Sequence, residues 1–375
     1  MKVKKILVLA SAILFSLILL EAGLRILSIF FMYSPKNSQV YHDRLGRRID
    51  PALPDIDENG FRNPGVPDSA DIAVLGDSHT YGVNVKSEKS WPRQLADMSG
   101  LTVYNLGVGG YGTLQYYYLF DSAAALKPKH IILALYPAND LNDVCKLIDK
   151  SDYWKEWSRA RGYDAGICSG SSDWLSGINR TLSGLHVYWM AASAIKRVNE
   201  SVNFGDAISI KDPKNPTIIK YATINSHRKK MDLSREHIAL GLAVTEDLLR
   251  EMKKRAGSLG IEFSVVLIPS KEVVFFDYLK KKGYELPADY AGLVDNENEL
   301  VAEFSRFFRA EGIRFTDARP YIERDLYTSS GVYSTTDDGH PLEAGYNAYA
   351  RAVYEGILSA GVSDSGRGTA HKDGD

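Results

Sequence analysis

Ile-Ala-Val-Leu-Gly-Asp-Ser-His-Thr, at residues 72–80, is the stretch that decides the fold of this chain. A short apolar run that ends at a glycine predicts a buried strand followed by a tight turn. In α/β proteins ligands bind at the carboxyl edge of the sheet, and this turn would place Ser78 at that edge. A serine hydroxyl becomes a nucleophile only beside a base, so we expect another part of the chain to supply one.

Three later stretches carry side chains that suit such a site. A glycine cluster spans residues 105–110, an Asn139-Asp140 pair follows an apolar run, and His340 lies in the sequence Asp-Asp-Gly-His-Pro at 337–341. Each has an ordinary structural interpretation: a flexible loop, a helix cap at Asn139, and a helix start at His340-Pro341. Because all four stretches occur in one chain in this order, we interpret them together as a serine-dependent active site.

The remaining pattern predicts an α/β fold with a parallel sheet, because apolar strand-like runs alternate with helical runs. We expect a flavodoxin-like three-layer α/β/α sandwich with about five strands. Residues 141–234 break the pattern and are predicted to be an insertion near the active-site edge. The predicted strands are 72–75, 103–106, 130–136, 263–269 and 313–317, and the predicted helices are 91–99, 113–126, 235–256, 293–309 and 342–359.

The amino-terminal segment is apolar over residues 6–20 and 26–32, with lysines before it. We predict one transmembrane signal anchor over residues 1–33, with a cleaved signal peptide as the alternative. The lysines place the amino terminus inside, so the rest would lie in the bacterial periplasm or cell exterior. We further expect an extracytoplasmic stalk over 34–70, the main domain over 71–360 and a disordered tail over 361–375.

The composition limits the kinds of partner and cofactor. The 47 acidic and 45 basic residues nearly balance, so no nucleic-acid partner is expected. The only two cysteines, Cys145 and Cys168, either form a disulfide or remain separate thiols, and their number predicts no metal site. No dinucleotide-binding or P-loop pattern occurs in a suitable context, so we expect no cofactor.

These motifs resemble the blocks of the SGNH hydrolase superfamily, the GDSL-type esterases and acetyltransferases. The first block matches Gly76-Asp77-Ser78, with His79 in place of the commoner leucine. The second block matches the glycine that follows Asn105 by five positions, which is Gly110. The third block keeps Asn139 but lacks its usual glycine, because residues 137–138 are Pro-Ala.

The resemblance implies a role for each matching residue. Ser78 would be the nucleophile and His340 the base, while Gly76 and Asp77 would be structural. The N–H groups of Ser78 and Gly110 and the Asn139 amide would form the oxyanion hole. Two family patterns compete for the third triad member: Asp-x-x-His gives Asp337, and Asp-x-His gives Asp338, which the adjacent Gly-His-Pro sequence slightly favours.

The expected function is an extracytoplasmic serine esterase or O-acetyl transferase that acts on a cell-envelope or exopolysaccharide glycan. The sequence does not distinguish hydrolysis from transfer. A lipid or aryl ester hydrolase or a thioesterase is the first alternative. The second is a non-catalytic SGNH scaffold that binds glycan or envelope partners. The expected partners are therefore an ester-bearing small molecule or glycan and, through the amino-terminal segment, the membrane.

Overall fold

The computed structural model describes residues 2–31, 39–169 and 207–359. A five-stranded parallel sheet runs through its centre in the order β4-β3-β5-β8-β9. This is the flavodoxin-like order, in which the first strand lies between the second and the third. The predicted α/β fold with a parallel five-stranded sheet is confirmed. The strands are β3 (Ile72–Leu75), β4 (Val103–Asn105), β5 (His130–Leu135), β8 (Glu262–Leu267) and β9 (Arg314–Asp317).

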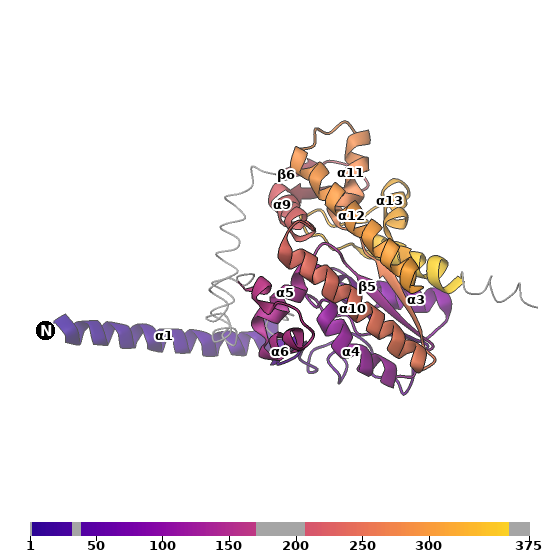
Figure 1. The fold of residues 1–375 in the computed structure, drawn as a ribbon. Coiled ribbons are helices and arrows are strands. Elements are labelled where there is room, and N and C mark those ends of the chain that lie inside the picture. The colour runs from indigo at the N-terminus through magenta and orange to yellow at the C-terminus, as the bar shows by residue number, and fades with distance from the viewer. Residues whose placement is uncertain (1, 32–38, 170–206, 360–375) are drawn as a thin grey trace, which may run out of the picture. The chain divides into compact units, whose positions relative to one another are not determined.

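Helices cover both faces of this sheet. In Figure 1, α4 (Thr113–Ala125), α10 (Glu236–Ser258) and α12 (Ala288–Glu311) lie across the front of the sheet. On the other side, α3 (Trp91–Ser99) packs against β4 and against α14 (Glu343–Val353). Because both faces are covered, every residue of β3 and β5 is buried, which explains their continuous apolar sequence.

The segment between β5 and β8 contains more regular structure than the sequence pattern predicted. After β5 come α5 (Asp140–Lys150), α6 (Asp152–Ala160) and the 3₁₀ turn η3 (Ala165–Cys168). Strands β6 (Ala207–Ile210) and β7 (Thr217–Lys220) form an antiparallel hairpin that leads into α9 (Tyr221–Lys230). The part of the predicted insertion over 170–206 lies outside the described residues. The other elements are β1 (Gln39–His42), β2 (Gly46–Ile49), α2 (Ser78–Tyr81), η2 (Ser87–Lys89), α11 (Lys271–Lys281), α13 (Arg319–Thr328) and the π-helical turn η4 (Tyr354–Ser359).

The amino-terminal helix α1 (Lys2–Phe31) belongs to a separate compact unit. That unit comprises 1–40 and 172–206, and the larger unit comprises 41–171 and 207–375. Across the described ranges, no helix combines the length and the apolar character that a membrane crossing needs. Glu21 and Arg25 divide the apolar sequence into two runs, each shorter than the roughly 20 residues of a bilayer span. The transmembrane helix predicted over 1–33 is therefore not found.

The segment before the first sheet strand packs onto the core. Leu45, Ile49 and Phe61 are all buried. Gly60 has φ +85°, and a Cβ there would lie 2.8 Å from the carbonyl oxygen of Ile49. A residue other than glycine would therefore meet both backbone strain and a steric clash. The Gly60 turn and the buried Phe61 side chain thus hold this segment on the core.

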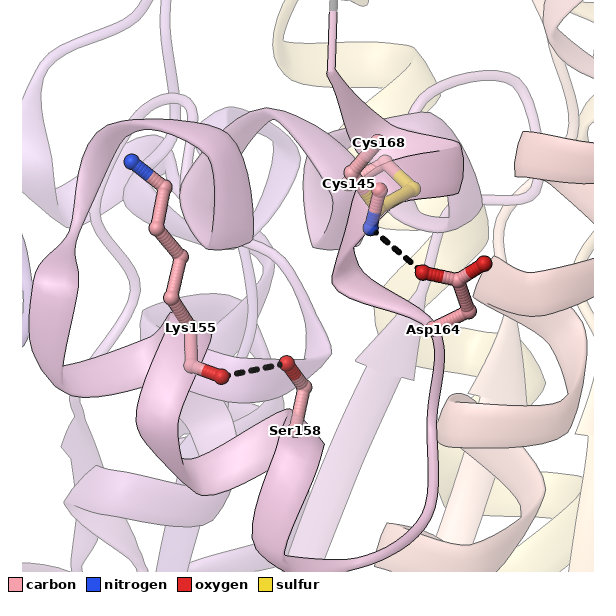
Figure 2. The surroundings of a disulfide bond; sticks show 6 residues. Cys145, Lys155, Ser158, Asp164 and Cys168 are labelled. Carbon is pink, nitrogen blue, oxygen red and sulfur yellow. Dashed lines mark hydrogen bonds between the residues drawn. A yellow bond between two sulfur atoms is a disulfide. The ribbon is translucent and has the colours of Figure 1, made fainter.

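A disulfide joins Cys145 in α5 to Cys168 in η3, and Figure 2 shows it between these two elements. Both cysteines are fully buried. The Asp164 carboxylate accepts the Gly166 N–H at 2.8 Å and shapes the turn that brings Cys168 to Cys145. Of the two sequence alternatives, the structure shows the disulfide.

Candidate active site

Ser78 lies where β3 ends and α2 begins, at the carboxyl edge of the sheet. The side chain of Asp77 caps α2 by accepting the His79 N–H at 2.9 Å. The turn is tight: a Cβ on Gly76 would lie 2.1 Å from Thr80 Oγ1 and 3.2 Å from the Ala134 Cβ. Gly76 and Asp77 thus have the local positions that a structural role requires.

A hydrogen-bonded relay connects Ser78 to residues that lie more than 250 positions later in the chain. The Oγ of Ser78 is 2.8 Å from His340 Nε2, and His340 Nδ1 is 2.7 Å from Asp338 Oδ1. Asp338 also accepts the backbone N–H of His340 at 2.8 Å. This is the geometry in which an imidazole takes a proton from serine while a carboxylate fixes its tautomer.

The structure separates the two candidate carboxylates. Asp337 is 2.7 Å from Lys220 Nζ and forms an ion pair with it. Asp338 contacts His340 directly, so the geometry favours Asp338 for the third position. Burial opposes the ionisation of Asp338, but its hydrogen bond to His340 and the charge of His340 hold its pKa well below the ordinary value. The carboxylate is therefore ionised at neutral pH.

Asp77 lies behind the nucleophile. Its Oδ2 accepts a hydrogen bond from Asn139 Nδ2 at 3.3 Å and lies 3.4 Å from Ser78 Oγ. Burial raises the pKa of Asp77 to about 6, although the His79 N–H and the charge of His340 oppose the rise. The contact with Asp77 orients the Asn139 amide, which has a second N–H available for a ligand.

The expected oxyanion donors gather around Ser78. Ser78 is the first residue of α2, so its N–H has no acceptor within the helix. In the glycine cluster, a Cβ on Gly109 would lie 3.6 Å from the Ser78 Cβ, and Gly110 follows with φ +74°. Asn139 approaches from the start of α5 through Asp77. Ser78 thus lies beside Gly109 and is linked through Asp77 to Asn139, while the oxyanion hole itself stays a prediction.

His79 packs into the wall of the site. It is 2% exposed, and its ring centroid lies 4.4 Å from that of Tyr136 and 4.9 Å from that of His340. Burial lowers the pKa of His79 well below its ordinary value, and the charge of His340 adds to this effect. A neutral, buried imidazole can therefore occupy the place of the leucine that is commoner in the resembling family.

The segment before β3 supplies contacts to the site that the sequence pattern did not predict. Arg47 Nη2 donates to the carbonyl oxygen of Gly109. Asn63 donates to the carbonyl oxygen of Asn105 at 3.0 Å and accepts the Asn105 N–H at 3.0 Å. Asn105 in turn accepts the Gly107 N–H at 2.8 Å. These bonds fix the glycine cluster, and no local motif marks Arg47 or Asn63 in the sequence.

The described residues give no indication of a metal centre. Within these ranges, no three or more His, Cys, Asp and Glu side chains are grouped so that they could hold a metal ion. Beside Ser78, the Asp338 carboxylate bonds His340 and the Asp77 carboxylate accepts a hydrogen bond from Asn139.

A parallel sheet with a Ser–His–Asp relay at its carboxyl edge has the architecture of α/β serine hydrolases. The model of the GDSL-like Lipase/Acylhydrolase family matches residues 74–164. The match includes Ser78, the glycine cluster and Asn139, and ends before Asp338 and His340. This part of the chain is therefore similar to GDSL-like lipases and acylhydrolases, which agrees with the resemblance that the sequence motifs show.

Solved structures also show similarity. A putative lipolytic protein of the G-D-S-L family from Desulfitobacterium hafniense is 15% identical, with coverage of 75% of this chain and 98% of that one and a TM-score of 0.38. An extracellular lipase from Streptomyces rimosus is 13% identical, with 77% and 100% coverage and a TM-score of 0.41. The esterase EstA from Pseudoalteromonas is 11% identical, with 77% and 97% coverage and a TM-score of 0.34. A search of the curated proteins found no match.

Proposed function

We propose that this protein is a serine esterase or O-acyltransferase that works through an acyl-Ser78 intermediate. The observation that carries the proposal is the continuous relay from Ser78 Oγ through both nitrogens of His340 to Asp338. Ser78 and His340 are both partly exposed, so an ester can reach them.

The mechanism has two halves. Ser78 Oγ attacks the ester carbonyl while His340 Nε2 takes the hydroxyl proton, and Asp338 stabilises the imidazolium. The Ser78 N–H, the Asn139 amide and a donor from the glycine cluster stabilise the negative oxygen of the tetrahedral intermediate. His340 then returns the proton to the departing alcohol, which leaves the acyl group on Ser78. Water completes hydrolysis, or an acceptor hydroxyl completes transfer, by giving its proton to His340 and attacking the acyl group. The bond from the acyl carbon to Ser78 Oγ then breaks, and His340 returns the proton to Ser78 Oγ.

The proposal is tested by intact-mass spectrometry of the full-length protein after treatment with a fluorophosphonate. Ser78 Oγ would displace fluoride and retain the phosphonyl group. We expect one adduct on the wild type, no adduct on Ser78→Ala, and turnover of p-nitrophenyl acetate only by the wild type. If the folded wild-type protein gave neither adduct nor turnover, this proposal would be contradicted, and the alternative of a non-catalytic scaffold would be favoured.

We place this activity outside the cytoplasm, in the periplasm or at the cell exterior. A buried disulfide supports this location, because disulfides form and persist in oxidising compartments. Fractionation of a bacterial host that expresses the full chain provides the test. Recovery in the cytoplasm with both thiols reduced would contradict this location.

For the substrate, we propose an acetyl ester on an envelope or exopolysaccharide glycan. This substrate class follows from the location proposed above, where envelope glycans lie, and from an acyl-serine intermediate, which can pass its acyl group to water or to a sugar hydroxyl. Release of acetate from an acetylated polysaccharide should exceed release from p-nitrophenyl esters of longer acids. A preference for long acyl chains or thioesters would instead favour the lipase or thioesterase alternative. Added acceptor glycan that captures the acyl group would show transfer.

A further inference from the structure

Lys271, the first residue of α11, is a buried lysine whose ammonium group reaches the catalytic loop. It is 1% exposed. Its Nζ donates to three backbone carbonyl oxygens: Thr336 at 2.9 Å, Ile218 at 3.1 Å and Asp338 at 3.2 Å. Three donors thus meet three acceptors, and two of those acceptors lie in the loop that presents the triad carboxylate.

The β6–β7 hairpin also bonds this loop. The Thr217 hydroxyl lies 2.7 Å from the carbonyl oxygen of Ser334 and 3.0 Å from that of Thr336. The Ile218 N–H donates to the Thr336 carbonyl at 3.4 Å. Lys271 therefore joins three parts of the chain: helix α11, strand β7 and the loop that ends at His340.

A buried ammonium is expensive unless all its donors are bonded, so its presence here requires a compensating arrangement. Burial lowers the pKa of Lys271 to about 8, while the charges of Glu272, Asp338 and Asp337 oppose the fall. The lysine is thus charged at neutral pH and bonds the loop with three N–H groups. A charged donor forms stronger hydrogen bonds to carbonyl oxygens than a neutral one.

We propose that Lys271 is a positioning residue of the acyl-transfer reaction, which holds the carboxylate of Asp338 in register with His340 through the carbonyls of Thr336 and Asp338. This inference rests on the proposed function. Asp338 contributes both its carboxylate and its main-chain carbonyl: the first bonds His340, and the second bonds Lys271. A shift of the loop would therefore move the carboxylate away from the imidazole.

The test uses full-length Lys271→Met, which keeps much of the side-chain length and removes the three donors. With p-nitrophenyl acetate, kcat should fall about ten- to hundredfold, because small misplacements of a catalytic group cost rates of this order. KM should stay within about twofold, because Lys271 contacts no part of the substrate site. Lys280→Met, which removes an exposed lysine from the same helix, is the matched control and should retain wild-type kcat.

A double-mutant cycle with Asp338→Asn separates positioning from general destabilisation. If Lys271 acts through Asp338, adding Lys271→Met to Asp338→Asn should cost less than about twofold in kcat. An equal loss in both backgrounds, or wild-type kcat in folded Lys271→Met, would overturn the inference. Fluorophosphonate labelling of the wild type decides the proposed function separately, so the two failures are distinguishable.

If Lys271→Met does not fold, Thr217→Val provides a second test of the same inference. Valine has the shape of threonine but lacks the hydroxyl that bonds the loop at Ser334 and Thr336. A fall in kcat of about threefold or more, with KM unchanged and the fall absent in the Asp338→Asn background, supports the positioning role. Unchanged kcat in a folded Thr217→Val protein would overturn it.

Discussion

The imidazole rings of His79 and His340 lie with their centroids 4.9 Å apart, and Tyr136 covers His79 on another side at 4.4 Å. His79 Nδ1 is buried and has no hydrogen-bond partner among the described residues. Protonation of His79 is opposed by the burial of its ring and by repulsion from a protonated His340. The folded protein therefore requires His79 to be neutral beside the catalytic histidine.

This requirement predicts that the stability of the folded protein depends on pH. The substitution His79→Leu should weaken that dependence. Burial lowers the folded-state pKa of His79, so below its ordinary value of about 6.5 the unfolded chain binds a proton that the folded chain does not. Stability should therefore fall as the pH falls through 6.5, by about 1.4 kcal/mol between pH 8 and pH 5.5 from this group. Chemical denaturation at both pH values measures the difference. An identical pH dependence in His79→Leu would show that His79 is not the group responsible.

The two neighbouring aspartates should respond very differently to substitution. Asp338→Asn removes the charge that fixes and stabilises the His340 imidazolium, and we expect kcat to fall by about 10⁴. Asp337→Asn breaks a partly exposed ion pair with Lys220 and leaves the bond between Asp338 and His340 in place, so kcat should stay within a few-fold of the wild type. Steady-state kinetics with p-nitrophenyl acetate measures both. A larger loss in Asp337→Asn would assign the triad position to Asp337.

The strands of the sheet could be predicted from the sequence because they are marked by short apolar runs. The runs that became β3 and β5 are continuous and apolar because helices bury both of their faces. The predicted strands 72–75, 103–106, 130–136, 263–269 and 313–317 match β3, β4, β5, β8 and β9 to within a few residues. Helix α11 was missed because its apolar residues do not form one stripe: residues 271–276 are all buried.

Contacts that depend on tertiary structure were beyond the sequence pattern. In the sequence, Lys271 has the pattern of an ordinary surface residue. In the folded protein, α11 places its ammonium group against the catalytic loop. Arg47 likewise becomes part of the site only when the segment before β3 packs onto the core and reaches Gly109. The choice between Asp337 and Asp338 also needed coordinates, because the resemblance on which the prediction rested allowed either spacing to His340. Local motifs identify groups that react, whereas groups that hold them come from distant segments.

The Cys145–Cys168 disulfide should stabilise the fold without taking part in the chemistry. The disulfide closes a loop with a sequence separation of 23. A cross-link over a loop of this length lowers the conformational entropy of the unfolded chain and so stabilises the fold by about 3 kcal/mol. The paired substitution Cys145→Ser and Cys168→Ser should lower Tm by several degrees and leave kcat nearly unchanged at 25 °C. Calorimetry and kinetics on the same sample separate these effects. A large loss of kcat with unchanged Tm would show that α5, which begins beside Asn139, depends on the disulfide for its catalytic position.

Asn139→Ala tests the oxyanion hole with little effect on the fold. Asn139 stands at the N-cap position of α5, yet its side chain makes no capping hydrogen bond, so its loss should not destabilise that helix. Its Nδ2 instead donates to Asp77 Oδ2 at 3.3 Å, which orients the amide. Because a single preorganised donor lowers the barrier by about 3 kcal/mol, kcat should fall by about 10²–10³ with KM little changed. Fluorophosphonate labelling should slow in parallel, since the phosphonyl oxygen develops charge at the same place. If the variant kept wild-type kcat and labelling rate, the developing charge would have to be stabilised by the backbone N–H groups of Ser78 and the glycine cluster alone.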